Sequence, residues 1–153
     1  MDKAGVSKPV RKMAMLGSYV PRLCGIATFT ADLGQALTDQ SPGAHLFVLA
    51  MNDAGRTYNY PGAVRFEIAE SDLASYRRAA DFLNVNSIDV LSVQHEYGIF
   101  GGKAGAHVLA LLRELRMPIV TTFHTLLTSP GDLHRAVLEE ICSLSERLVV
   151  MTE

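Results

Sequence analysis

The alternation of short apolar segments with helically patterned ones most limits how this chain of 153 residues can fold. Runs of bulky and β-branched side chains recur along its length. Four of the six runs are followed by a segment whose apolar residues fall on one helical face. Consecutive parallel strands need crossover connections, which are usually helices. The pattern therefore predicts the α/β class, with a parallel sheet that carries helices on both faces.

The boundaries of the expected elements follow from the same pattern. We expect strands at residues 12–17, 46–51, 64–68, 90–93, 119–123 and 148–151, with a long loop at 52–62. Helices are expected around residues 26–37, 73–83, 103–116 and 130–146. Ser129 and Pro130 look like the cap and the first position of the last helix, and Asp132 places an acid in its first turn.

Composition narrows the class of protein further. Apolar residues make up 48% and charged residues 20%, which is typical of a single globular domain of this length. The net charge of −2, without a basic stripe, argues against a nucleic-acid partner. Two cysteines without CxxC spacing indicate free thiols in a reducing compartment. No apolar run is long enough to span a membrane and no signal-peptide layout is present, so we expect a cytoplasmic protein.

Three unusual segments follow strands, at residues 17–27, 94–102 and 121–125. Ligands of open α/β sheets bind beyond the carboxyl ends of the strands, so we expect these segments to converge on one rim. Gly25 stands just before a helix, where backbone N–H groups can hold a phosphate. Gly17 and Gly25 could equally serve only to form a turn. The dinucleotide fingerprint G-x-G-x-x-G is missing from this loop.

The glycine-rich stretch at residues 98–103 superficially resembles a P-loop. Its spacing fails, and Ala104 stands where serine or threonine would bind magnesium, which argues against a nucleoside triphosphatase. Gly101 and Gly102 remain as a glycine pair behind two aromatic residues, Tyr97 and Phe100. Such a loop can form the wall of a substrate site.

Two histidines, His95 and His124, are each expected at the carboxyl end of a strand. A single strand histidine is often structural, but two on one rim favour a functional role. An imidazole there could donate hydrogen bonds to hydroxyl groups or phosphate oxygens. No ligand spacing supports a metal site built from these histidines and Cys24, which we interpret as a neutral lining residue. His107 and His134 fall on expected helices and are interpreted as surface or packing residues.

With these segments in view, the chain resembles the N-terminal domain of GT-B-fold glycosyltransferases, most nearly family four of the retaining enzymes. The resemblance runs over nearly the whole chain. It is carried by Tyr-Val-Pro followed by Gly-Ile-Ala at residues 19–27, His-Glu-Tyr-Gly-Ile-Phe-Gly-Gly at 95–102, and Val-Thr-Thr-Phe-His-Thr at 120–125. It implies that residues 1–153 form a Rossmann-like N-terminal domain and that the C-terminal donor-binding domain is absent from this chain.

The resemblance also implies roles for individual residues. Gly25, with Ile26 and Ala27 adjacent, would reach the donor diphosphate beside the acceptor. Cys24 occupies a position where the family commonly has a second glycine, which would limit the approach of a phosphate. His124 matches the histidine that contacts the transferring sugar. The remaining candidates, near the acceptor or the sugar, are His95, Glu96, Tyr97, Gly101 and Gly102.

The implied activity is transfer of a hexose from a nucleotide-diphosphate sugar to a sugar or lipid-linked acceptor, with retention. It would need no metal or other cofactor, and it would belong to the complete protein, with this fragment inactive. A lipid-linked acceptor would bring peripheral membrane contact. The alternatives are a nucleotide-sugar epimerase or hydrolase of GT-B-like fold, and a non-catalytic flavodoxin-like binding domain.

Two further observations bear on these alternatives. The first strand and its end, at residues 13–19, contain no acidic residue, which argues against a phosphoacceptor domain. A dehydrogenase would need the glycine fingerprint and an acid at the end of the second strand, and neither is expected here.

Overall fold

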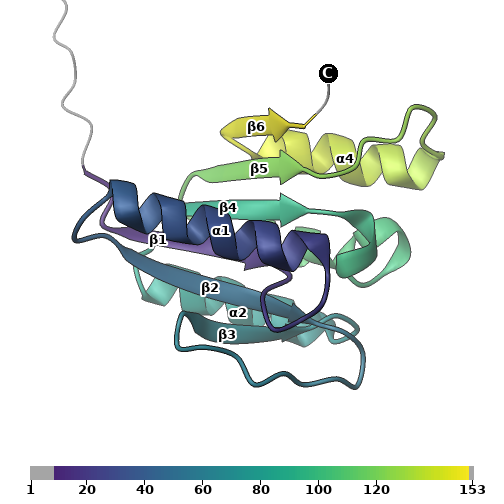
Figure 1. Cartoon of the computed structure of the whole chain (residues 1–153). Helices are drawn as coiled ribbons and strands as arrows, with labels where there is room; N and C mark the ends of the chain where they lie inside the picture. Colours follow the sequence, from purple (N-terminus) through teal and green to yellow (C-terminus); the bar gives the residue numbers. More distant parts are fainter. Residues whose placement is uncertain (1–8, 152–153) are drawn as a thin grey trace, which may run out of the picture.

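The computed structural model describes residues 9–151, which form one all-parallel sheet of six strands (Figure 1). The order across the sheet is β3-β2-β1-β4-β5-β6. The strands are β1 (Lys12–Gly17), β2 (His45–Asn52), β3 (Val64–Ala69), β4 (Val90–His95), β5 (Ile119–Phe123) and β6 (Arg147–Val150). The predicted α/β fold class is confirmed, and each expected strand lies close to its expected position.

Helices cover both faces of the sheet, as predicted (Figure 1). One face carries α1 (Gly25–Gln40), and the other carries α2 (Leu73–Val85), α3 (His107–Leu112) and α4 (Asp132–Leu144). From β1 the chain first builds outward to β2 and β3, then returns through α2 to β4 on the other side of β1. The direction of strand addition therefore reverses between β1 and β4, which is where sheets of this kind bind ligands.

The larger part of the core lies between the sheet and α2, α3 and α4. Alternate residues of the central strands point into it because successive side chains of a strand face opposite sides. They meet Tyr76, Leu83, Leu111 and Ile141 from the helices, all of which are fully buried. Burial of one such side chain contributes about 2 kcal/mol, so this side of the sheet dominates the stability of the domain.

Two expected helices begin differently from the prediction. The helix expected at 103–116 is divided, because Ala104 and Gly105 have φ angles of 54° and 73° that no α-helix contains. The short 3₁₀ turn η2 (Lys103–Gly105) takes its first part, and α3 follows. The last helix is capped by Gly131 and not by Ser129, because the extended backbone of Gly131 excludes Pro130 from the helix.

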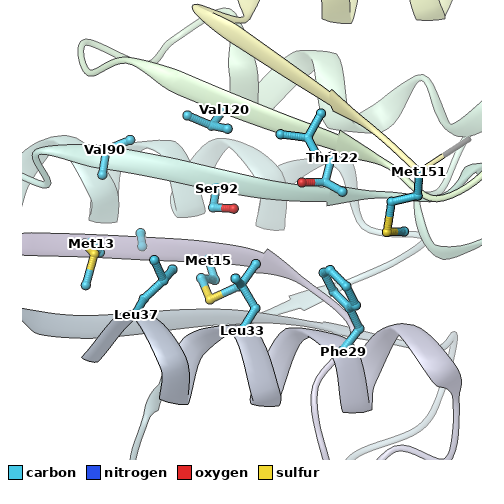
Figure 2. A pocket seen from close by; sticks show the side chains of 12 residues that line it. Met13, Met15, Phe29, Leu33, Leu37, Val90, Ser92, Val120, Thr122 and Met151 are labelled. Carbon is cyan, nitrogen blue, oxygen red and sulfur yellow. The ribbon is translucent and has the colours of Figure 1, made fainter. Parts of the chain in front are cut away.

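The face that carries α1 is only partly covered. An apolar groove of about 350 Å³ runs between α1 and strands β4, β5 and β6 (Figure 2). Phe29, Leu33 and Leu37 of α1 form one wall, and Val120 and Val149 lie on the floor. The edge strand β6 is exposed along its whole length. Within residues 9–151, no helix is both long and apolar enough to cross a bilayer.

Candidate functional site

The three unusual segments do converge on one rim, as predicted. Strands β1, β4 and β5 are parallel neighbours, so Gly17, His95 and Phe123 end together at the same edge of the sheet. The backbone N–H of His124 donates to the carbonyl of His95 at 3.0 Å. A Cβ placed on Gly17 would stand 3.0 Å from Cβ of Gln94, so glycine allows these two strand ends to approach closely. The rim lies beside the point where strand order reverses.

His124 is the candidate residue that the fold holds most firmly at this rim. Its Nε2 lies 2.9 Å from Oε1 of Gln94, and its ring meets Phe29 of α1 edge to face, with centroids 4.9 Å apart. The residue is half-buried and lines a cavity of about 460 Å³ together with residues 125–128 and Met151. Burial lowers the pKa of His124, and the nearby carboxylate of Glu96 opposes that shift. The ring is therefore mainly neutral at pH 7.

Glu96 joins the loop after β4 to the loop after β5. Its Oε1 accepts from the backbone N–H of Tyr97 at 2.9 Å, which caps the 3₁₀ turn η1 (Tyr97–Ile99). Its Oε2 accepts a hydrogen bond from Oγ1 of Thr125, the residue after His124. The half-buried carboxylate thus fixes the relative position of the two loops and places a negative charge close to His124.

The N-terminus of α1 offers free backbone donors beside this rim. Gly25 and Ile26 lie in the first turn, where no intrahelical acceptor exists for their N–H groups. Gly25 is exposed, and a Cβ added to it would meet no atom within 4 Å. Ala27 differs, because its side chain is fully buried and its N–H donates to Sγ of Cys24 at 3.3 Å. Cys24, predicted to be only a lining residue, is therefore the N-cap of α1.

The pair Arg22 and Asp53 was missed by the sequence analysis. Nη2 of Arg22 lies 2.6 Å from Oδ1 of Asp53, while Nη1 donates to Oγ of Ser18 at 2.9 Å. The hydroxyl of Tyr58 donates to the other carboxylate oxygen at 2.6 Å. Asp53 directly follows β2, so the statement that no acid stands at the end of the second strand was wrong. This acid is engaged by Arg22, which connects the loop after β1 to the loop after β2.

His95 lies beneath the rim and not on its surface. Its side chain is fully buried on the opposite face of the sheet from His124, stacked on Phe100 and in edge contact with Tyr97 and Phe123. Neither ring nitrogen has a hydrogen-bond partner within residues 9–151, and the hydroxyl of Tyr97 is likewise buried and unpartnered. Burial lowers the pKa of His95 to about 4, with Glu96 acting in the opposite direction. His95 therefore supports the rim from below.

This burial makes stability depend on pH. Unfolded His95 has a pKa near 6.5 and the folded residue about 4, so the unfolded chain binds a proton first as the pH falls. The contribution of His95 is complete above pH 6.5 and is lost as the pH falls to about 4, by about 3 kcal/mol in total. We expect His95→Leu to remove this part of the acid sensitivity, measured by urea unfolding between pH 7 and pH 4.

A matched control for that experiment is His45→Leu, because His45 is exposed at the start of β2. Replacement of His45 should leave the slope of unfolding free energy against pH as it is in the native chain. An identical slope in the native chain and the His95→Leu variant would contradict the prediction, whatever the offset between them at pH 7.

Gly101 and Gly102 are explained by packing within the domain. The N–H of Gly101 donates to the hydroxyl of Tyr76 at 2.9 Å, and a Cβ at this position would stand 1.9 Å from the carbonyl oxygen of Glu70. Gly102 has a φ of 80° and lies against the ring of His107. Neither glycine lines the cavity beside His124. The role of His107 as a packing residue, expected from its helical position, is seen in these contacts.

Nothing in the described chain forms a metal centre. Within residues 9–151, no three side chains among histidine, cysteine, aspartate and glutamate come together in a way that could hold a metal ion. The groups that the rim presents include the backbone N–H groups at the start of α1, the imidazole of His124 and the carboxylate of Glu96.

Comparison with known proteins addresses the fold. No family model and no curated protein matches the chain. One similar solved structure is described as "alpha-glucosyltransferase in complex with UDP and a 13-mer DNA containing a central A:G mismatch". It matches 91% of this chain with a TM-score of 0.56 at 13% sequence identity. The two chains share a fold. This chain spans only 36% of the length of that glucosyltransferase, so the likeness concerns one part of it.

Proposed function

We propose that the chain is the N-terminal domain of a two-domain glycosyltransferase of the GT-B type. The whole enzyme would transfer a hexose from a nucleotide-diphosphate sugar to a sugar or lipid-linked acceptor, with retention. The observation that carries this proposal is the rim where His124, held by Gln94 and Phe29, lines a cavity close to the open N-terminus of α1. The shared fold with a structure described as a glucosyltransferase bound to UDP supports the same class of reaction.

Different parts of the rim would bind different parts of the donor. The N–H groups of Gly25 and Ile26 would bind an oxygen of the diphosphate, since a helix N-terminus carries a partial positive charge. None of the first-turn residues of α1 is acidic, so no side chain there competes with an anion. His124 would contact the sugar. Glu96 and Thr125 would hold the loop of His124 in place through their hydrogen bond.

Catalysis by such a site would depend on positioning and on stabilising the charge of the departing diphosphate. The rim is one wall of the cleft. The second wall, with most of the nucleotide site, would belong to a second domain, as the 36% coverage of the similar glucosyltransferase suggests. Ala27 and His95 would contribute through packing, because both are fully buried.

The proposal is tested by comparing the 153-residue chain with a longer polypeptide that adds the second domain. Both are incubated with a panel of nucleotide-diphosphate hexoses and acceptors, and release of the nucleoside diphosphate is measured. We expect transfer only from the longer polypeptide, with NMR of the product showing retention. Transfer by the 153-residue chain alone, or no reaction of the longer polypeptide with any donor, would contradict the proposal.

A further inference from the structure

Gln94 lies beside the ring of His124, where it can determine which ring nitrogen carries the hydrogen. Its side chain points from β4 toward the α1 side of the sheet and is fully buried, although it is polar. Nε2 of its amide donates to Oγ of Ser92 at 3.0 Å, which leaves Oε1 to face Nε2 of His124 at 2.9 Å. With the amide in this orientation Oε1 accepts, and the imidazole carries its hydrogen on Nε2.

The surroundings leave Gln94 and His124 little freedom to adopt another arrangement. Gly17 packs against Cβ and Cγ of Gln94, where an added Cβ would stand 3.0 and 3.6 Å away. On the other side, Phe29 holds the imidazole ring at an interplanar angle of 86°. Within residues 9–151, Nδ1 of His124 makes no hydrogen bond, and it is not among the buried unpartnered atoms. It is therefore available to a ligand.

We propose that Gln94 is a positioning residue that fixes His124 as the Nε2–H tautomer, so that Nδ1 accepts a hydrogen bond from a hydroxyl group of the ligand. A diphosphate oxygen has no hydrogen to donate at neutral pH, so this nitrogen selects the sugar part of a donor over its phosphates. The assignment of the hydroxyl to a donor sugar rests on the proposed function. The tautomer does not depend on the proposed function, because it is inferred from the contacts of Gln94.

The tautomer is measured by two-dimensional ¹H–¹⁵N NMR of the histidine rings in the 153-residue chain at pH 7.5. We expect a single state for His124, with a pyrrole-like Nε2 and a pyridine-like Nδ1. Gln94→Met, which keeps the length of the side chain and removes the amide, should give a mixture of both tautomers. Gln35→Met is the matched control, because Gln35 is exposed on α1 and its amide binds the carboxylate of Asp39.

A dominant Nδ1–H form in the native chain would overturn the proposal, as would an unchanged tautomer in Gln94→Met. Should Gln94→Met fail to fold, Gln94→Asn provides the second variant, since its amide is too short to reach His124. The spectrum of the native chain tests the Nε2–H assignment of His124 even without either variant.

The ligand part is tested in the longer polypeptide with donors that lack single hydroxyl groups. For one deoxy-hexose donor, His124→Ala should cause no further loss of kcat/KM, whereas it lowers kcat/KM for the complete hexose. A further loss with every deoxy donor would overturn the hydroxyl assignment. Absence of any transfer would count against the proposed function and would leave the tautomer result standing, so the two failures are distinguishable.

Discussion

Replacement of Gly101 with alanine is expected to lower the free energy of unfolding by about 3 kcal/mol. The new Cβ would stand 1.9 Å from the carbonyl oxygen of Glu70 and 2.8 Å from its carbonyl carbon. Because these are backbone atoms, the clash is relieved only if the end of β3 or the loop that holds Gly101 moves. The same movement would break the hydrogen bond from the N–H of Gly101 to Tyr76. Urea unfolding at pH 7, followed by circular dichroism, measures the effect.

Gly98→Ala is the matched control in the same loop. Gly98 is exposed, its φ is not positive, and an added Cβ would meet no atom within 4 Å. We expect its unfolding free energy to stay within about 0.5 kcal/mol of the native value. Equal stability of the Gly98→Ala and Gly101→Ala variants would show that the glycine pair is not required by packing, and its role would then have to be sought in ligand binding.

The second large effect is expected for His124→Ala in the longer polypeptide. We expect kcat/KM for sugar transfer to fall about 100-fold, because one oriented hydrogen-bonding group at the reacting sugar is lost. The fold should be retained, since His124 is half-buried and lies at the rim. Transfer is measured by the release of nucleoside diphosphate, and the unfolding transition is recorded for the same preparation.

His45→Ala is the control for this variant. His45 is exposed at the first position of β2, at the end of the sheet opposite to the rim. It should keep native turnover, which separates the loss of a specific imidazole from the loss of any histidine. Unchanged turnover of His124→Ala would remove this residue from the site and leave the α1 N-terminus as the remaining candidate.

Much of the fold could be predicted because it depends on local periodicity. The strands are short, apolar and separated by amphipathic segments, so their positions and their parallel arrangement follow from the pattern. The convergence of the segments that follow β1, β4 and β5 on one rim also followed, because the carboxyl ends of neighbouring parallel strands must meet. The expectation that His95 would lie on this rim beside His124 was wrong, because its side chain is fully buried on the other face of the sheet. The helix starts were less predictable: Ala104 adopts a positive φ that nothing in its residue type indicates.

The details of the site could not be predicted because they depend on contacts between distant residues. Gln94 is one polar residue in a buried strand, and only the structure brings it to His124. Arg22 and Asp53 are 31 positions apart, and no spacing rule links a loop residue to the end of a later strand. The side of the sheet that each histidine faces depends on strand register. His95 pairs with Phe123, and His124 is the next residue along the chain, so the two histidines face opposite sides.

The reversal of strand order between β1 and β4 has a consequence for the folding reaction. Met13 pairs with Val90, so a loop of more than seventy residues must close before β1 and β4 can pair at the centre of the sheet. Pairings of such long range are slow to form because their entropy is lost before their contacts are gained. Phe29 and His124 meet across this ladder. Their ring contact, visible as a shifted histidine resonance, would therefore report the completion of folding and not the formation of its local helices.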